Sequence, residues 1–174
     1  MSLSLYQSSV PVFERSLNAF SAILDKAAAH AATCKFDSSI YLTMRLRPDM
    51  YAFPRQVQIF CDHAKNGAAR LAGVEAPRFE DNEASLDELK ARVKKTLDVL
   101  AGLDAKAIDA GAEREIIIPL GQKKAKMIGA NYFLHYALPN FYFHLTTAYA
   151  ILRYAGVAIG KRDYMGAVPG FTLF

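Results

Sequence analysis

Two histidines are the side chains of this sequence best suited to chemistry. His144 lies in an aromatic-rich segment that reads as a buried helix, and Asn140 and Thr147 share its strip at helical spacing. His63 borders the apolar stripe of another expected helix, with Gln56 two turns before it. Side chains on facing helices can build one ligand site. The sequence therefore predicts a small-molecule pocket between these helices, lined by His63, His144, Asn140, Gln56 and Thr147.

Purely structural roles for these histidines are the alternatives to a pocket. His144 could be a neutral buried imidazole that hydrogen-bonds to a neighbouring helix, and His63 a partly exposed residue at the edge of the bundle. His30 and His135 have no ligand partner at helical spacing and are expected to be structural. No nucleophile beside a base can be defended, so the catalytic residues, and whether the protein is an enzyme at all, stay open.

The elements that position these histidines are predominantly helical. A first helix is predicted from a cap at Ser8 or Ser9 to about Ala32. A second, after an irregular segment at 40–50, begins its apolar stripe at Met50 and stops at Gly73. The third begins at Ser85, with Glu88 completing a capping box, and ends at Gly102. The last is predicted over 139–155.

Between the third and fourth helices the pattern changes. Short extended runs surround Pro119 and Gly121, and they predict a small hairpin within 111–129. The apolar residues of the tail, 168–174, are expected to dock on the bundle. The predicted fold class is therefore all-α: a four-helix bundle with this small hairpin or extended excursion, forming one domain over 1–174.

Composition narrows the classes of function. The net charge is +4, but the basic residues are scattered, which argues against a nucleic-acid footprint. No apolar run approaches the ~18 residues of a membrane span, and the first ten residues lack the pattern of a signal peptide. Cys34 and Cys61 suggest neither a disulfide framework nor a thiolate zinc cluster. We expect a soluble, cytoplasmic protein.

The last predicted helix is apolar or aromatic on almost every side. A second strip on it, rotated from that of His144, carries Tyr142, Tyr149 and Arg153, residue types enriched in protein interfaces. A helix without a wet face is either central or shared. The strip predicts a homodimer, and the alternative is that the hairpin and the tail cover it within one subunit.

Several strings in the sequence carry a resemblance to a known family. They are RLRPDM at 45–50, ARLAG at 69–73, PNFYFHLTTAYAILR at 139–153 and GVAIGKRDY at 156–164. With them the chain resembles a bacterial domain-of-unknown-function family, number nineteen ninety-three, of the DinB/YfiT-like group. The resemblance implies a four-helix DinB-like fold that is commonly dimeric.

The resemblance also implies a metal site and an enzymatic alternative. Many relatives in the wider group hold a divalent metal with one histidine on the second helix and a pair spaced by four on the last. His63 and His144 match two of these positions, but Ala148 stands at the third. Unless a carboxylate such as Asp49 or Asp62 replaces it, zinc or nickel should bind weakly. The alternatives are thus a metal-dependent enzyme that transfers thiols or isomerises small acids, and a non-catalytic structural dimer.

Overall fold

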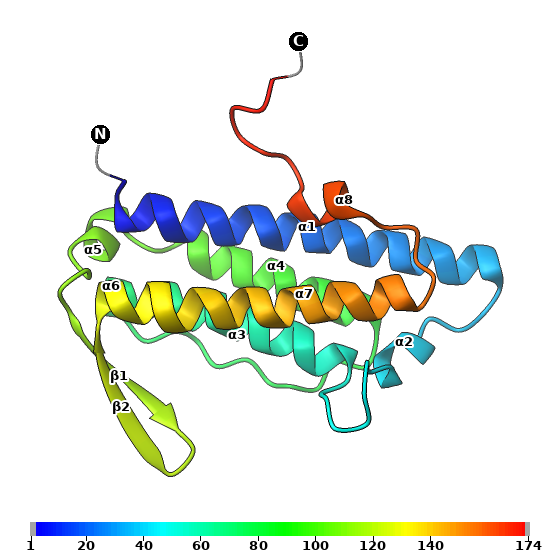
Figure 1. Cartoon of the computed structure of the whole chain (residues 1–174), viewed down its shortest axis with the longest axis horizontal. Helices are drawn as coiled ribbons and strands as arrows, with labels where there is room; N and C mark the ends of the chain where they lie inside the picture. The colour runs from blue at the N-terminus through cyan, green and yellow to red at the C-terminus, as the bar shows by residue number, and fades with distance from the viewer. Residues whose placement is uncertain (1–2, 173–174) are drawn as a thin grey trace.

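The computed structural model describes residues 3–172 and is mostly helical, as predicted, with one small two-stranded sheet. Its long helices are α1 (Leu5–Cys34), α3 (Phe53–Ala72), α4 (Leu86–Ala101) and α7 (Leu138–Tyr154), which lie side by side in Figure 1. Shorter helices lie between them, namely α2 (Ile40–Thr43), α5 (Ala105–Asp109) and α6 (Gly129–Tyr132), and α8 (Lys161–Met165) follows α7. One π-helical turn, Phe133–Ala137, joins α6 to α7. In the part of the chain that is described, none of these helices has the length and apolarity that crossing a membrane would require.

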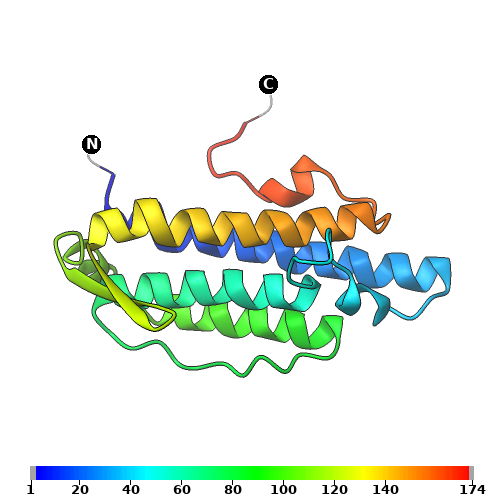
Figure 2. The same ribbon diagram turned by 60° about the horizontal axis from the view of Figure 1, so that its bottom comes forward.

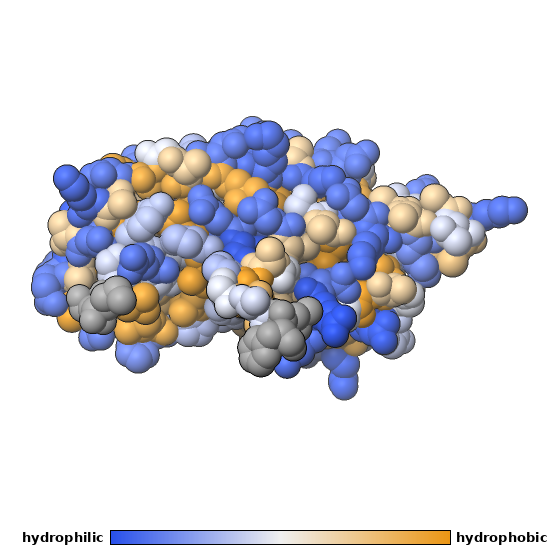
Figure 3. All heavy atoms as spheres, turned by 90° about the horizontal axis from the view of Figure 1, so that it is seen from above, coloured by the Kyte–Doolittle hydropathy of each residue, from blue (hydrophilic) through white to orange (hydrophobic). Residues whose placement is uncertain are grey.

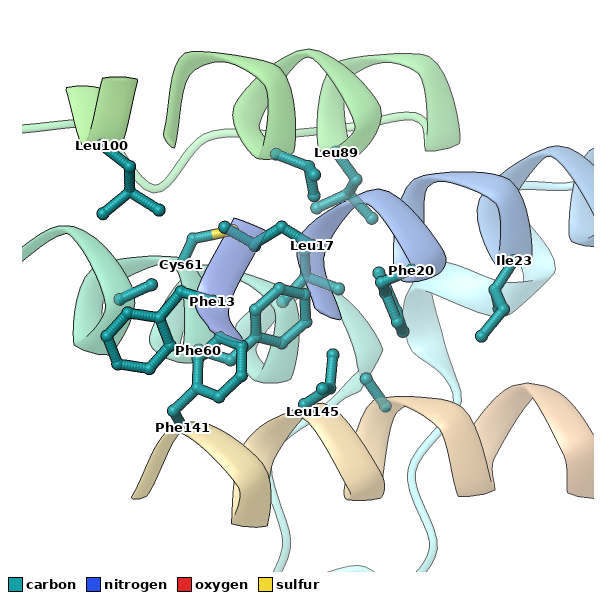
Figure 4. Close-up of a cluster of buried hydrophobic side chains, with 14 of the residues drawn as sticks. Phe13, Leu17, Phe20, Ile23, Phe60, Cys61, Leu89, Leu100, Phe141 and Leu145 are labelled. Atoms are coloured by element: carbon teal, nitrogen blue, oxygen red, sulfur yellow. The ribbon is translucent and has the colours of Figure 1, made fainter. Parts of the chain in front are cut away.

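The core forms where the apolar stripes of the long helices meet. Phe13 of α1 packs on Phe141 of α7, with ring centroids 4.7 Å apart, and Phe20 meets Phe60 of α3 edge to face at 4.9 Å. Figure 4 shows these rings converging from α1, α3 and α7, with Leu89 of α4 closing the cluster. Burial of such side chains supplies most of the driving force for folding, so the stripes fix how α3 faces α7.

The start of α1 differs from the prediction. The helix is capped by Ser4, whose Oγ accepts a hydrogen bond from the Gln7 backbone N–H at 3.1 Å, while the Gln7 side chain bonds back to Ser4. This capping box satisfies two free backbone donors. Ser8 and Ser9 lie inside the helix and donate to backbone carbonyls of the preceding turn. At its other end α1 continues past Ala32 to Cys34, where Lys35 turns left-handed with φ 58°.

The observed structure also differs from the prediction at two places before α3. Met50 lies before the helix instead of within it, because Ala52 is the N-cap and Pro54 occupies the first turn, where a missing N–H costs nothing. The segment predicted to be irregular contains the single turn α2. Gly73 ends α3 at φ 76°, as predicted, since glycine adopts this left-handed conformation without strain.

The hairpin forms where it was predicted. Strands β1 (Glu115–Leu120) and β2 (Lys123–Ile128) pair antiparallel around Gly121 and Gln122, with Ile118 opposite Ala125. Ile118 is buried, so the hairpin packs against the helices. The backbone shortly before the hairpin lies close against the end of α3. A Cβ added at Gly111 would lie 2.0 Å from the Leu71 carbonyl oxygen, so this contact requires glycine.

The connection between α3 and α4, residues 73–85, runs along the length of both helices (Figure 2). Buried cations hold it. Arg92 of α4 is 1% exposed and pairs with Asp81 at 2.9 Å and Glu83 at 2.8 Å, and Lys65 of α3 donates to the Pro77 carbonyl at 2.8 Å. Both cations lie over the Phe79 ring.

The carboxy-terminal segment docks only in part. Helix α8 lies on α1, where Asp163 pairs with Lys26 at 2.6 Å. The expectation that the tail docks is wrong for Phe171, which is 74% exposed, and residues 173–174 lie outside the described residues. The view from above in Figure 3 shows hydrophobic residues interspersed with hydrophilic ones on the face of α1 and α8.

Candidate functional site

Adjacent helices bring His63 and His144 together. His63 lies on α3 and His144 on α7, and their imidazole rings are parallel within 9°, with centroids 6.2 Å apart. Tyr136, at the π-helical turn before α7, meets the His63 ring edge to face at 5.8 Å. Phe143 contacts the His144 ring in the same manner at 5.0 Å. Aromatic neighbours therefore hold both imidazoles in place.

His144 is oriented by a hydrogen bond across the two helices. Its Nδ1 lies 2.7 Å from Gln56 Oε1, and Gln56 Nε2 donates to the Tyr51 carbonyl at 3.1 Å. Because the glutamine nitrogen is engaged elsewhere, its oxygen faces the ring and Nδ1–H is the donor. This assigns the tautomer and leaves Nε2 of His144 as an acceptor.

The surroundings of both imidazoles favour their neutral form. Burial lowers the pKa of His63 to about 4, helped by the neighbouring His144 and by the positive charge of Arg70. Burial also lowers the pKa of His144, and Arg55 adds to the effect. Desolvation and nearby cations act in the same direction on a histidine. The surroundings of the pair thus disfavour further positive charge.

A cleft of about 200 Å³ opens beside His63. It lies between α3, strand β1 and Tyr136. Within the described residues its wall consists of Arg55, Ile59, Asp62, His63, Asn66, Arg70, Ile118, Pro119 and Tyr136. The His63 ring, half-buried, has no hydrogen-bond partner in residues 3–172. Its nitrogens are therefore available to a molecule in the cleft.

The other predicted pocket residues occupy different places. His144 and Gln56 are bonded to one another, and neither belongs to the described wall of the cleft. Asn140 donates to the Tyr136 carbonyl at 2.7 Å, and Thr147 donates to the Phe143 carbonyl at 2.7 Å, so both bond to their own helical segment. Only His63 of the five lines this cleft.

Residues that the sequence reasoning missed fall into two groups. Five of them lie on α3 with His63, most of them three, four or seven to eight residues from it, so helical periodicity starting from His63 could have found them. They are Arg55, Ile59, Asp62, Asn66 and Arg70. Ile118 and Pro119 come from the hairpin, and no local pattern indicates where a hairpin folds back.

Charge is unevenly balanced in the cleft. Arg55 is paired with Asp81 of the connection. Asp62 lies 3.2 Å from Arg92 and 3.4 Å from Lys65. Arg70 has no carboxylate partner within the described residues, and its Nη1 donates to the Tyr132 hydroxyl at 3.0 Å.

The residues present do not fit a three-ligand metal site. Ala148, at the position where a third imidazole would stand, is completely buried among core side chains. Nδ1 of His144 is bonded to Gln56, and Asp62 faces two cations. Asp49 lies on an exposed loop. Across residues 3–172, no three histidine, cysteine or acidic side chains are grouped as metal ligands would be.

The predicted interface strip is partly covered by α8. Tyr164 of α8 meets the Tyr149 ring edge to face at 5.4 Å, and its hydroxyl bonds to Thr146 at 2.7 Å. Tyr142 is half-buried, and it lines a shallow apolar groove together with Phe143, which is 59% exposed. Arg153 is exposed. The covering segment is α8, and the hairpin lies elsewhere.

Comparison with known proteins gives a family and a fold. A family model described as "Domain of unknown function (DUF1993)" matches residues 5–165. A crystal structure of a DinB family member protein from Shewanella denitrificans is similar over 97% of this chain and 96% of that one. The two are 41% identical, with a TM-score of 0.88. No curated protein matches.

Proposed function

The chain belongs to the DUF1993 family, and we propose that it binds a small molecule in the cleft between α3, strand β1 and Tyr136. In this proposal residues 1–174 form a single DinB-like domain whose long helices constitute a four-helix bundle. The assignment is one of ligand binding at His63. The similarity to the DinB family member supports the fold of this proposal.

The observation that carries the proposal is the free imidazole of His63. The ring is half-buried and has no hydrogen-bond partner among residues 3–172, and its nitrogens are not among the fully buried polar atoms of that range, so they can be reached from the cleft. It faces a concave wall that mixes apolar side chains with polar groups from two elements. This combination is typical of ligand sites, where a few polar groups fix the orientation of a largely apolar contact.

His144 has a positioning role in this proposal. Its ring lies parallel to that of His63 and is held from behind by Gln56. Tyr136 meets the His63 ring edge to face. An imidazole fixed in this way loses little side-chain entropy when a ligand binds, which favours affinity.

A fragment screen by NMR would test the proposal. A library of small organic molecules, neutral and charged, is titrated into ¹⁵N-labelled protein. We expect binding molecules to shift the backbone amides of Asn66, Ile118 and Tyr136 together. His63→Leu should weaken such binding, because it removes the imidazole nitrogens that a molecule in the cleft could hydrogen-bond.

The control is another histidine outside the cleft. His135 is exposed and is absent from the described wall, so His135→Leu makes the same chemical change elsewhere and should leave binding unaltered. If no molecule shifts the cleft amides, or if His63→Leu binds every fragment as the native protein does, the proposed function is wrong.

A further inference from the structure

We propose that the cleft selects a short-chain carboxylate, with the Arg70 guanidinium binding the carboxylate group. This inference rests on the proposed function, because it names the class of ligand for that cleft. It is carried by three observations, which concern charge, the rigidity of Arg70 and the shape of the wall.

The first observation is that one positive charge in the wall is not balanced. The wall carries three charged side chains, and two of them are satisfied inside the protein: Arg55 by Asp81, and Asp62 by Arg92 and Lys65. Arg70 alone has no opposite charge within the described residues. A cationic ligand would meet this charge without a free carboxylate to oppose it. An anion would be attracted.

The second observation is that the Arg70 side chain is held in position. Its Nη1 donates to the Tyr132 hydroxyl at 3.0 Å, and its Cζ lies 5.8 Å from the centre of the Tyr132 ring. Tyr132 is itself fully buried, so the anchor is rigid. A guanidinium has five N–H donors, and the Tyr132 contact engages one of them. Donors remain for the paired hydrogen bonds that a carboxylate accepts.

The third observation is the apolar part of the wall. Ile59 of α3 and Ile118 and Pro119 of β1 border the cleft together with Arg70. A ligand with one charged end and a short apolar body would meet both kinds of surface. At about 200 Å³ the cleft is smaller than the ~300–1,000 Å³ of sites for drug-sized ligands. The body is therefore limited to a few carbon atoms.

A comparison of acids with their amides tests the inference. Acetate, propionate and butyrate are titrated by NMR against acetamide, propionamide and butyramide, with sodium chloride added to the amides to equal ionic strength. Each pair has nearly the same shape and differs in charge. We expect each acid to bind the cleft at least about tenfold more tightly than its amide, because a charge-assisted hydrogen bond is worth more than a neutral one. Affinity should rise from acetate to butyrate.

Variants of Arg70 and of Tyr132 show which side chain causes the preference for acids over amides. Arg70→Gln should remove the preference for acids while leaving the amides bound as before, and Arg70→Lys should retain part of it. Tyr132→Phe removes the hydrogen bond but keeps the guanidinium, and it should weaken the preference less than Arg70→Gln. If Arg70→Gln does not fold, the acid-to-amide ratio of the native protein and of Arg70→Lys still decides the question.

The outcomes separate this inference from the proposed function. If the amides or other neutral fragments bind the cleft as tightly as the acids, the proposed function stands and the carboxylate preference is wrong. If Arg70→Gln retains the preference, Arg70 is not the carboxylate site. If nothing binds at His63, both statements fail together.

Discussion

His63 and Arg70, one full heptad apart on α3, determine the chemistry that the cleft can offer. The guanidinium keeps its charge and the imidazole does not, since burial and the positive charge of Arg70 both hold the pKa of His63 near 4. At pH 7 the pair therefore presents one cation and one neutral ring that can accept or donate a hydrogen bond. This arrangement suits an anionic ligand with a second polar group better than it suits a metal cation.

The lowered pKa of His63 makes the protein less stable in acid. The unfolded chain protonates this histidine near its ordinary value of 6.5, whereas the folded protein resists protonation down to about 4. The unfolded state thus binds more protons in this window, and stability falls as the pH drops from about 6.5 towards 4. We expect His63→Gln to reduce this loss by at most about 3 kcal/mol, measured by urea unfolding at a series of pH values.

The comparison of the two proteins is needed because carboxylates also titrate in that window. The informative quantity is the difference in free energy of unfolding between the native protein and His63→Gln, which should change between pH 7 and pH 4. An NMR titration of the His63 ring gives its pKa directly. A midpoint near 6.5, or a free-energy difference that is constant with pH, would contradict the prediction.

Part of the site could be predicted from the sequence. Each histidine borders an apolar stripe of its own predicted helix, which led to the prediction that the two face one another. The structure places their rings 6.2 Å apart. The direction in which the cleft opens was not predictable, because it depends on where the hairpin folds back against α3. Asn140 and Thr147 share a strip with His144, yet their side chains bond to backbone carbonyls of their own segment. Polar residues of this kind often do so within helices.

At the scale of elements, local signals determined how well each boundary was predicted. Ser85 and Gly73 were identified correctly because each fulfils one steric or hydrogen-bonding requirement at a helix end. Ser4 was missed because Ser8 and Ser9 carry the same side chain nearer to the apolar stripe. The connection at 73–85 is rich in acidic residues, and nothing local in the sequence shows that Arg92, a helix residue, is buried beneath it.

The connection between α3 and α4 depends on that buried arginine. Arg92 contacts Asp62, Asp81 and Glu83, and its Nη1 also donates to the Glu80 carbonyl at 3.0 Å. Without Arg92, Asp62 still faces Lys65 and Asp81 still faces Arg55, but Glu83, which is 9% exposed, loses its ion pair among the described residues. We expect Arg92→Met to lower the free energy of unfolding in urea by about 3 kcal/mol or more.

The matched control is a cation on the same helix. Lys94 pairs with Asp98 at 3.0 Å, but both side chains are largely exposed. Lys94→Met should therefore change the free energy of unfolding by less than about 1 kcal/mol. Similar effects of the two substitutions would show that the buried network does not hold the connection. Faster hydrogen exchange of residues 74–84 in Arg92→Met would locate the loss there.

At the scale of the whole molecule, the outer face of α7 remains to be accounted for. The predicted strip divides in the structure: Tyr149 packs against Tyr164 of α8, while Tyr142 borders an apolar groove shared with Leu46 and Phe143. Phe143 is 59% exposed and Leu46 is 39% exposed. Exposed apolar residues that lie together, and not singly, are typical of interaction sites. We therefore expect the contact of the predicted homodimer at this groove, which includes Tyr142, and not at Tyr149.

We expect the protein to sediment at about twice the 19.2 kDa mass of one chain, and Phe143→Glu to shift it towards the monomer. A glutamate at this position would be buried without a partner in the dimer, which costs several kcal/mol, but would be solvated in the monomer.

Val74→Glu is the control, because Val74 is similarly exposed, at 50%, and lies on the connection instead of on α7. It should leave the mass unchanged. Sedimentation velocity over a range of concentrations measures both, and a native protein that stays monomeric throughout would refute the dimer. A dimer that persists in Phe143→Glu would place the contact on another face.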